Sequence, residues 1–474
     1  MSELVLPEGW VKTEISNIAE VIAGGTPSSK NPDYFCEPRT GISWLTPADL
    51  TGYEKMYISH GRRDITEAGY KSSSAKLMPK GSVVFSSRAP IGYVAIAEKD
   101  LSTNQGFKSF VIPDGLSSEY LYFYLKSIKG LAESLGTGTT FKELSGRACK
   151  KLPLVMAPLS EQKVIAHTLE HHLTTVSQIQ ARLDAIPKLI EKFRQSVLND
   201  AVSGKLTEEW RTTNKYKIED KNLLKDSEKY WSIPEQWAWS RLGEHVKLIN
   251  GDRGKNYPNK SEYVEEGIPF INTGHITRKG FLESSALNYI TEEKFNSLKG
   301  GKISEGDLVY CLRGATMGKV ARVTPYSEGA IASSLVIIRP LDSVLTDYIY
   351  YFSISPQGRE LIKVFDNGSA QPNLSAKSLS WFSFPLPSIE EQEVIVNSVS
   401  KLFAHADQIE KSVAAAKARI DNLTQSILHQ AFTGNLTADW REQNPDLISG
   451  DNSAETLLAK IEAEKKANKT KKKK

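Results

Sequence analysis

The sequence predicts an α+β fold in which two mixed, β-rich domains are joined by two long antiparallel coiled-coil helices, as a tandem pseudo-twofold duplication. Three observations predict this fold. The chain repeats itself, each copy begins with short β-branched and aromatic runs separated by turn residues, and each copy ends in one long helical period. A chain of 474 residues, 40% of them hydrophobic, can bury more than one core.

The repeat is clearest at the end of each copy. Residues 195–211 (QSVLNDAVSGKLTEEWR) and 425–441 (QSILHQAFTGNLTADWR) are identical at nine of seventeen positions, at an offset of 230. The segments around 26–75 and 253–300 share little, so two copies of one frame carry two different inserts. Further matching pairs lie upstream: LPEGW (6–10) with IPEQW (233–237), GSVVFSSR (81–88) with GDLVYCLR (306–313), EYLYFYL (119–125) with DYIYYFS (347–353), and APLSEQKVI (157–165) with PSIEEQEVI (387–395).

Each copy begins with a globular, β-rich part. The runs SVVFS and GYVAIA in the first copy, and DLVYCL and SLVIIRP in the second, indicate strands because they are flanked by turn residues. The predicted boundaries are a first domain at 1–156, a helical spacer at 157–211, a linker at 212–232, a second domain at 233–386, a second spacer at 387–441 and a tail at 442–474.

The spacers carry apolar residues at alternating steps of four and three, which is the period of a coiled-coil seam. Because both copies keep this period, we expect two paired helices rather than a single buried one. Pro187 should kink or locally break the first helix, where the second copy has Lys417. The seam residues are Ile165, Leu169, His172, Val176, Ile179, Leu183, Ile186, Ile190, Phe193 and Val197 in the first copy, and Ile395, Val399, Leu402, Ala406, Ile409, Val413, Ala416, Ile420, Leu423 and Ile427 in the second.

The net charge of +4 depends on the tail. Residues 465–474 hold seven lysines, so the rest of the chain has a net charge of 4 − 7 = −3, and the global charge gives no argument for a nucleic-acid partner. We expect the lysine-rich end to be solvated and disordered, with non-specific contact with a polyanion as the alternative. Without a run of about 18 apolar residues or a signal peptide, a cytoplasmic protein with no membrane partner is expected.

Motifs for catalysis are missing. GATMGKV (314–320) has the wrong spacing for a phosphate-binding P-loop, and the three cysteines form no CxxC pair. NPDY (31–34) is similar to the adenine-holding motif of amino-methyltransferases, but Asp33 stands at the second Pro position, so a turn is expected. His167, His171 and His172 lack a third metal ligand, and His172 is expected to pack between the helices. These patterns favour a binding protein with no catalytic residues and no metal site.

The ordered set of motifs resembles Type I restriction-modification specificity subunits along nearly the whole chain, and the ending NPDLISGDNSAETLLAKIEAEK (444–465) resembles that of their K-type enterobacterial branch. This set comprises LPEGW, GGTPS (24–28), STNQGFKSF (102–110), GTTFKELS (138–145), the Leu-Ser-Glu-Gln start of the first spacer, and GKLTEEWR with the matching segment GNLTADWR of the second copy. At Ala157-Pro158 and Pro387-Ser388 this chain departs from the family's usual double-Pro start of a spacer.

The resemblance implies two target-recognition domains, each reading one half of an asymmetric split DNA sequence. It also implies that the helical spacers dock two adenine-N6 methyltransferase subunits and that two restriction-translocase subunits join them. The chain itself would need no cofactor, because S-adenosylmethionine, ATP and magnesium would be used by those partners. Two alternatives stay open: a self-sufficient adenine methyltransferase, and a coiled-coil adaptor that never touches DNA.

We expect the DNA-reading residues in the divergent inserts and in the loops that face them, because side chains at base edges carry sequence specificity. Arg88 and Arg313 stand out, since they follow matching strands. A structural arginine paired with a local carboxylate would also explain such a match. The candidates are Ser28, Lys30, Arg39, Arg62, Arg63, Lys76, Arg88, Thr139 and Lys142 in the first domain, and Arg253, Lys255, Asn256, Lys260, Asn272, His275, Arg278, Arg313 and Gln371 in the second.

Overall fold

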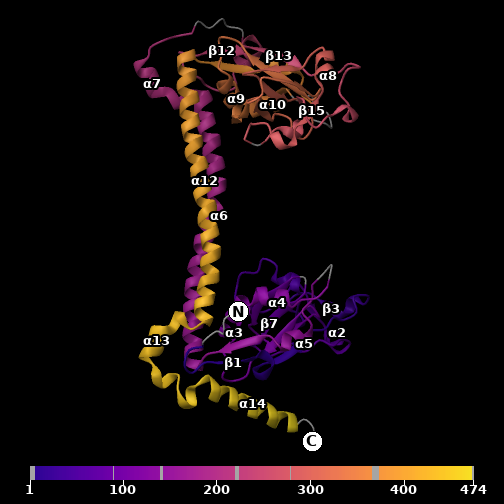
Figure 1. Cartoon of the computed structure of the whole chain (residues 1–474), viewed down its shortest axis with the longest axis vertical. Helices are drawn as coiled ribbons and strands as arrows, with labels where there is room; N and C mark the ends of the chain where they lie inside the picture. The colour runs from indigo at the N-terminus through magenta and orange to yellow at the C-terminus, as the bar shows by residue number, and fades with distance from the viewer. Residues whose placement is uncertain are drawn as a thin grey trace. The chain divides into compact units, whose positions relative to one another are not determined.

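The computed structural model describes residues 6–88, 90–138, 142–218, 224–277, 279–365 and 373–471. The chain divides into two compact units (Figure 1). Unit 1 consists of residues 1–183 and 415–474, and unit 2 consists of residues 184–414. Each unit therefore combines the β-rich part of one copy with a helical segment that belongs to the other copy.

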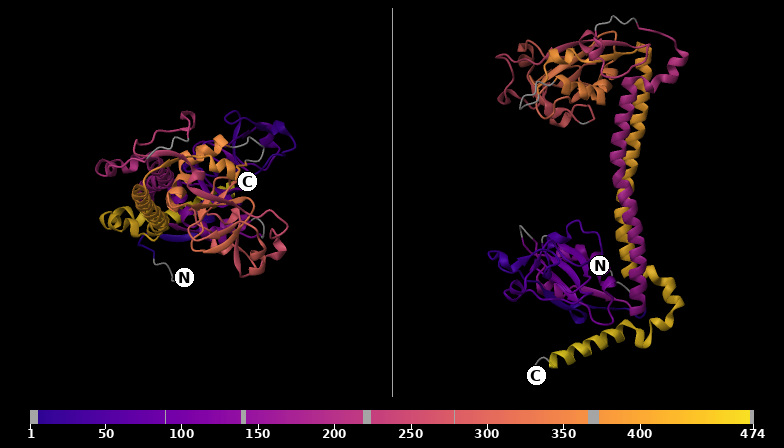
Figure 2. Two further views of the ribbon diagram at one scale, coloured as in Figure 1. Left: turned by 90° about the horizontal axis from the view of Figure 1, so that it is seen from above. Right: turned by 180° about the vertical axis from the view of Figure 1, so that it is seen from behind.

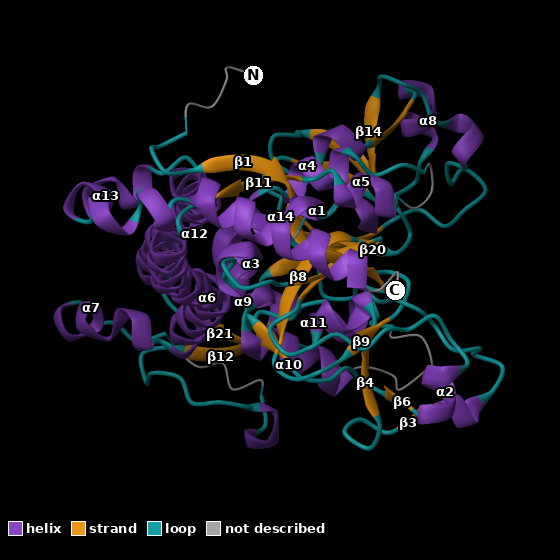
Figure 3. Ribbon diagram, turned by 90° about the horizontal axis from the view of Figure 1, so that it is seen from below, coloured by secondary structure: helices purple, strands orange, loops and turns teal. Residues whose placement is uncertain are grey.

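Unit 1 contains a five-stranded sheet in the order β2-β10-β7-β8-β5, a four-stranded sheet in the order β3-β6-β4-β9, and the pair β1–β11. Figure 3 labels β3, β4, β6 and β9 of the four-stranded sheet and the pair β1–β11. All five residues of the central strand β7 are buried. The elements are β1 (Val11–Glu14), α1 (Ile15–Ile18), β2 (Glu20–Ala23), β3 (Phe35–Cys36), β4 (Ile42–Leu45), β5 (Tyr57–Ile58), β6 (Asp64–Ile65), α2 (Glu67–Lys71), β7 (Val83–Ser87), β8 (Ile91–Ala97), β9 (Ser102–Thr103), β10 (Lys108–Val111), α3 (Ser118–Ser127), α4 (Lys129–Ser134), α5 (Gly146–Lys150), β11 (Pro153–Met156), α13 (Ala438–Gln443) and α14 (Ala454–Lys471).

Unit 2 contains two four-stranded sheets, in the orders β13-β20-β17-β18 and β15-β14-β19-β16, and the pair β12–β21. Its elements are α7 (Glu208–Thr213), β12 (Ala238–Arg241), β13 (Val246–Asn250), β14 (Ile268–Ile271), β15 (Asn288–Ile290), α8 (Glu292–Ser297), β16 (Lys302–Ser304), β17 (Leu308–Cys311), β18 (Val320–Arg322), β19 (Glu328–Ile331), β20 (Leu335–Pro340), α9 (Thr346–Ile354), α10 (Pro356–Phe365), α11 (Ala376–Ser380) and β21 (Ser383–Leu386).

The two units share a topology even where their sequences diverge. The order β2-β10-β7-β8 in unit 1 corresponds to β13-β20-β17-β18 in unit 2. A parallel pair also recurs between one strand of each divergent insert and a strand outside it, as β4 beside β9 and as β14 beside β19. The predicted duplication and the strands in SVVFS, GYVAIA, DLVYCL and SLVIIRP are therefore confirmed.

The two long helices are α6 (Leu159–Ser203) and α12 (Ile389–Phe432), and part of each lies in each unit (Figures 1 and 2). In unit 1, Ile165 and Leu169 share a core with Leu428 and Phe432. In unit 2, the C-terminal part of α6 packs on the N-terminal part of α12, and Arg194 donates to Asp407 Oδ1 at 2.7 Å. The helices are thus paired antiparallel within each unit.

The inward face of these helices differs from the predicted seam. Ile179, Phe193, Ile409 and Leu423 are 42% to 49% exposed, and His172 is exposed although it was expected to pack between the helices. The residue that follows each of them is less exposed: Leu173, Gln180, Arg194, Glu410 and Thr424. Of the other expected seam residues, Ile165, Leu169, Ile190, Val197, Ile395, Val399, Ala406 and Val413 are buried, whereas Val176, Leu183, Ile186, Leu402, Ala416, Ile420 and Ile427 are half-buried.

This difference has a geometric cause. In α6 the less exposed positions run 165, 169, 173, 176, 180, 183, 186, 190, 194 and 197, so the alternation of four and three is interrupted more than once. Each interruption moves the inward position by one residue from the place that a strict heptad repeat gives it. Polar side chains consequently occupy part of the inward face.

The structure bears on two expectations about helix ends and breaks. α6 continues through Pro187 without a break, and Pro187 is exposed there. The lysine-rich end was expected to be disordered, but α14 runs through Lys471. Ile461 of this helix is buried in the core of unit 1, and Lys465 Nζ donates to the carbonyl of Ser16. No helix in the described part of the chain is both long enough and apolar enough to span a bilayer.

Candidate nucleic-acid interface

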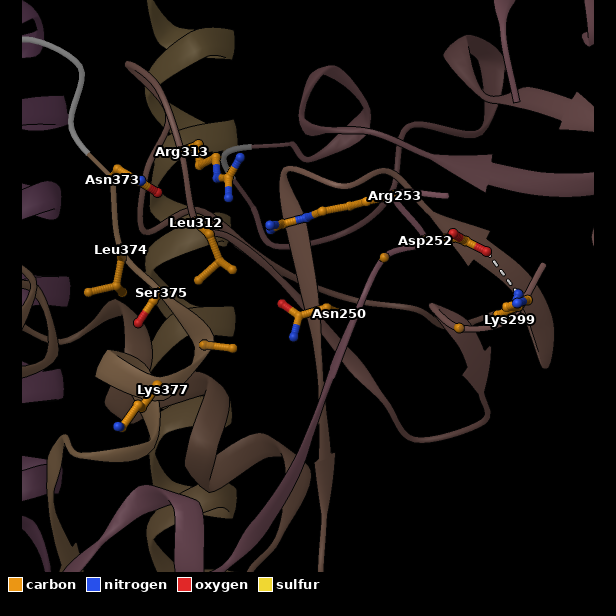
Figure 4. Close-up of a pocket in the computed structure, with 13 residues that line it drawn as sticks. Asn250, Asp252, Arg253, Lys299, Leu312, Arg313, Asn373, Leu374, Ser375 and Lys377 are labelled. Atoms are coloured by element: carbon orange, nitrogen blue, oxygen red, sulfur yellow. Dashed lines mark hydrogen bonds between the residues drawn. The ribbon is translucent and has the colours of Figure 1, made fainter. Parts of the chain in front are cut away.

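A basic pocket of about 590 Å³ opens in unit 2 between the ends of β13 and β17 and the start of α11. Arg253 follows β13 and Arg313 follows β17, and Figure 4 shows both side chains extending into the same space. Arg253 Nη2 donates to the carbonyl of Ser333 at 3.4 Å, which holds its side chain. The structure therefore brings two of the predicted DNA-reading arginines together.

The charge of this pocket is positive. Lys299 and Lys377 also line it, and Asp252 is the acidic residue among its lining residues. The backbone N–H groups of Gly254 and Lys299 donate to Asp252 at 2.7 and 2.8 Å and lower the pKa of this carboxyl group. Within the described ranges, neither Arg253 nor Arg313 has a carboxylate within ion-pair distance. An arginine without a local carboxylate can present its guanidinium to a base edge or a phosphate.

The matching arginine of unit 1 has a different neighbour. Arg88 follows β7 as Arg313 follows β17, and each bridges to the backbone of a facing residue, Glu143 for Arg88 and Asn373 for Arg313. Arg88 Nη1 lies 3.9 Å from Glu143 Oε2. This carboxylate offsets the charge of Arg88, so matching positions in the two units offer different surfaces to a ligand.

A second basic cluster lies in unit 1 around β3 and β6. Arg63 places its guanidinium 4.2 Å from the ring centre of Phe35 and 5.3 Å from that of Trp44. Arg62 is exposed, donates to the carbonyl of Ala48 and lies 3.8 Å from Asp49. The N–H of Arg39 donates to Asp64, the neighbour of Arg63, so the loops that carry three predicted residues up to 24 positions apart lie side by side.

Three candidates of unit 2 have structural contacts instead. His275 is 5% exposed, its Nδ1 accepts the backbone N–H of Asn272, and burial lowers its pKa. The side chain of Asn272 accepts from Gly274 N, and Asn256 donates to the carbonyl of Ser297 at 2.7 Å. His275 is therefore a buried residue of the fold, in place of the expected DNA contact, because its ring is not accessible.

The remaining candidates that the structure describes lie on the surface. Ser28, Lys30, Lys76, Lys142, Lys255 and Lys260 are exposed. Thr139, Arg278 and Gln371 lie outside the described residues. The NPDY segment forms a short turn in which the Asn31 side chain accepts from Asp33 N, which confirms the predicted turn.

Sequence reasoning missed a buried polar network at the start of each long helix. Glu161 is fully buried and accepts from Trp10 Nε1 at 2.7 Å, from Thr437 Oγ1 at 2.6 Å and from Arg441 Nη1 at 2.6 Å. In unit 2 Glu391 accepts from the equivalent set, Trp237, Thr207 and Arg211, and also from Tyr216.

These networks explain why the short motifs recur in both copies. Glu161 is the Glu of LSEQ. It accepts hydrogen bonds from the Trp of LPEGW and from the Thr and Arg of GNLTADWR. At Gly434, which has a φ of +82°, a Cβ would lie 2.2 Å from Pro7 of LPEGW. Each end motif thus docks on the start of the other copy, and the repeated sequence was the signal that could have revealed it.

Comparisons with known proteins agree with this architecture. The family model for the Type I restriction modification DNA specificity domain matches residues 7–188 and again 234–416. The EcoKI specificity subunit of Escherichia coli K12 is 31% identical, with 99% of this chain and 98% of that subunit covered. The EcoBI specificity subunit of E. coli is 33% identical, with 86% and 85% covered.

Solved structures show the same fold. The crystal structure of the HsdS subunit from Thermoanaerobacter tengcongensis matches with a TM-score of 0.59 and 19% identity, covering 92% of this chain and 99% of that one. A chain from a structural study of complex assembly and conformational transition in the type I R-M system matches with a TM-score of 0.62 and 17% identity. It covers 90% of this chain and 98% of that one.

Proposed function

The chain belongs to the family of Type I restriction-modification specificity subunits, and on this premise we propose that it reads an asymmetric, bipartite DNA site. One observation carries the proposal: the family match occurs twice, once over each β-rich domain, while the matching positions differ in chemistry. Arg88 faces Glu143, whereas Arg313 faces Asn373. Two domains of one topology with different side chains at the same place are suited to reading two different half-sites.

The paired helices support the proposal of partner subunits. Leu189 is 60% exposed, and Phe193 and Ile409 in the same unit are also exposed. Ile179 and Leu423 are exposed on the helical segments of unit 1. Apolar side chains that gather into a contiguous exposed patch mark interaction surfaces. We assign these surfaces to two adenine-N6 methyltransferase subunits, with two restriction-translocase subunits joining the core.

Under this proposal the chain supplies recognition and its partners supply chemistry. Methyl transfer from S-adenosylmethionine and ATP- and magnesium-dependent cleavage take place in the partner subunits. The chain contributes the arginines and lysines that meet the DNA, together with the helices that connect its two readers. The gap between the half-sites then depends on those helices rather than on any catalytic residue.

The proposal is tested by co-expressing the chain with its methyltransferase partner and mapping methylated adenines in the host genome. The expected result is one split sequence whose two halves differ and are separated by a fixed gap. Methyl transfer by the purified chain alone would replace the proposal with a self-sufficient methyltransferase. A complex that assembles but shows no salt-dependent binding to duplex DNA would indicate an adaptor.

A further inference from the structure

Arg39 of unit 1 has an unusual backbone. Its φ is +72°. Among the residues that the structure describes, Arg39 is the only non-glycine residue with a positive φ. This left-handed region crowds the Cβ of an L-residue against the backbone, so glycine is the residue that adopts it without cost. A residue that stays strained where glycine would be relaxed is a candidate for a functional role.

A buried carboxylate holds this strained backbone in place. Asp64 of β6 is fully buried, and its Oδ2 accepts the N–H of Arg39 at 2.8 Å and that of Gly41 at 3.3 Å. Asp64 pairs with Cys36 of β3 and with Ser43 of β4. The loop that joins β3 to β4 therefore wraps around Asp64, and the position of Arg39 is fixed by the sheet.

The side chain of Arg39 is oriented as well. Its Nε donates to His60 Nε2 at 3.2 Å, so that nitrogen of His60 must be the acceptor. The other ring nitrogen, Nδ1, lies 2.9 Å from Ser59 Oγ, which can accept its proton. This arrangement uses only the Nε–H of Arg39. Its two terminal Nη groups form the fork that matches a pair of acceptors.

A purely structural role fits these contacts poorly. The residue is exposed, and no carboxylate in the described part of the chain pairs with its guanidinium. Asp64 is held through the backbone N–H of residue 39, which any amino acid except proline supplies. The fold thus requires a backbone at this position but no arginine side chain.

We propose that Arg39 reads a guanine in the half-site recognised by the first domain, with Asp64 and His60 as positioning residues. The two Nη groups would donate to O6 and N7 of the guanine in the major groove. The backbone of Arg39 and its Nε hydrogen bond orient the guanidinium before DNA binds. The side chain therefore loses little conformational freedom on binding, and its fixed direction favours one base over the others. This inference rests on the proposed function, because it names one contact within it.

The decisive variant is Arg39→Gly, assembled with the methyltransferase partner. Glycine adopts a φ of +72° without strain and keeps the N–H that Asp64 accepts, so the Tm should equal or exceed that of the wild type. Methylome mapping should show relaxed sequence preference at one G·C position of one half-site, with discrimination reduced about 5- to 150-fold. The other half-site should be unchanged.

Three outcomes would overturn the inference. Full discrimination in Arg39→Gly would show that the side chain is not read. Uniform weakening at all sequences, with a salt slope reduced by about one, would indicate a phosphate contact. A clear fall in Tm would show that the arginine supports the fold. If the wild-type complex methylates no bipartite site, the proposed function itself fails, which is a separate result.

His60 gives an independent arm. His60→Phe keeps a ring but removes the acceptor for Arg39 Nε, so discrimination should fall at the same base position as in Arg39→Gly. His60→Gln offers an amide oxygen as the acceptor and should restore part of the base discrimination. If the effect of His60→Phe came from lost packing alone, His60→Gln would not restore discrimination. Lys71→Ala removes an exposed charge from α2 of the same unit and serves as the matched control, with unchanged specificity. Loss of discrimination in His60→Phe at other positions would contradict the positioning role.

Discussion

Arg441 Nη1 donates to Oε1 of Glu161 at 2.6 Å, joining residues that are 280 positions apart. The carboxylate is fully buried, and the arginine side chain is 14% exposed. Arg441 Nη2 also donates to the carbonyl of Gly434, so the guanidinium bridges the end motif of the second copy and the first long helix. Breaking such a pair leaves a buried charge without its partner.

We therefore expect Arg441→Ala to destabilise unit 1 by about 3–5 kcal/mol. The loss should appear as a lower Tm and a lower urea midpoint. Combining Arg441→Leu with Glu161→Gln removes both charges and should cost less than the single change. If Arg441→Ala alone costs under about 1 kcal/mol, the pair is as weak as an exposed one.

A fragment ending near residue 215 should form a homodimer. It retains Trp10, Glu161, Thr207 and Arg211, the residue types of the network, so Arg211 of one copy can pair with Glu161 of the other. A true twofold axis would replace the pseudo-twofold relation and cover the exposed helix. The fragment lacks α14, which weakens its domain core.

Light scattering gives the mass of this fragment, and methylome sequencing in the presence of the methyltransferase gives its target. The dimer carries two copies of the first domain, so it should modify an interrupted palindrome. Glu161→Ala in the fragment should favour the monomer, because the dimer would lose its network. A wild-type fragment that stays monomeric, or that modifies the original asymmetric sequence, would contradict the duplicated arrangement.

Arg313→Ala should weaken methylation at the cognate site more than Arg88→Ala does. If Arg313 is bidentate to a guanine, the loss is on the order of 1 to 3 kcal/mol. Arg88 is already opposed by Glu143, so less DNA interaction is expected from it. The DNA-binding constants of the two variant complexes show which arginine contributes more. Gel filtration checks that both complexes assemble.

Exchanging the facing residues gives the matched test. Asn373→Glu would place a carboxylate opposite Arg313, as Glu143 stands opposite Arg88, and should lower DNA affinity. Glu143→Asn should raise the affinity contributed by the first domain. Equal effects of Arg88→Ala and Arg313→Ala would remove the basis for treating the two matching positions as different.

DNA binding should depend steeply on salt. We expect weak binding by the chain alone and tight binding with methyltransferase partners, because more phosphate contacts form in the assembled complex. Affinity should fall by orders of magnitude between about 50 and 200 mM salt if six or more phosphates are neutralised. A flat salt response of the assembled complex at its specific site would rule out the proposed arginine and lysine contacts.

Much of the fold was predictable because it depends on local patterns. Strands such as VVFSS and the long helices follow from residue type and period, and the repeat indicated that one topology occurs twice. The site was less predictable. Arg39, Arg62 and Arg63 were expected as separate candidates, and the β3–β6 pair brings them together. His60 carried no signal of its own, since a lone histidine in a loop has many uses.

The sequence by itself determined the duplicated frame, the antiparallel helix pair and the family, because these follow from order and periodicity along the chain. The tertiary structure alone decided which residues face inward. Interruptions of the four-three alternation expose Ile179 and Phe193 and turn Gln180 and Arg194 inward. It also decided that Glu161 binds Arg441 from the other copy. Such contacts join residues that are hundreds of positions apart, and a buried charge must find its partner wherever the fold places it.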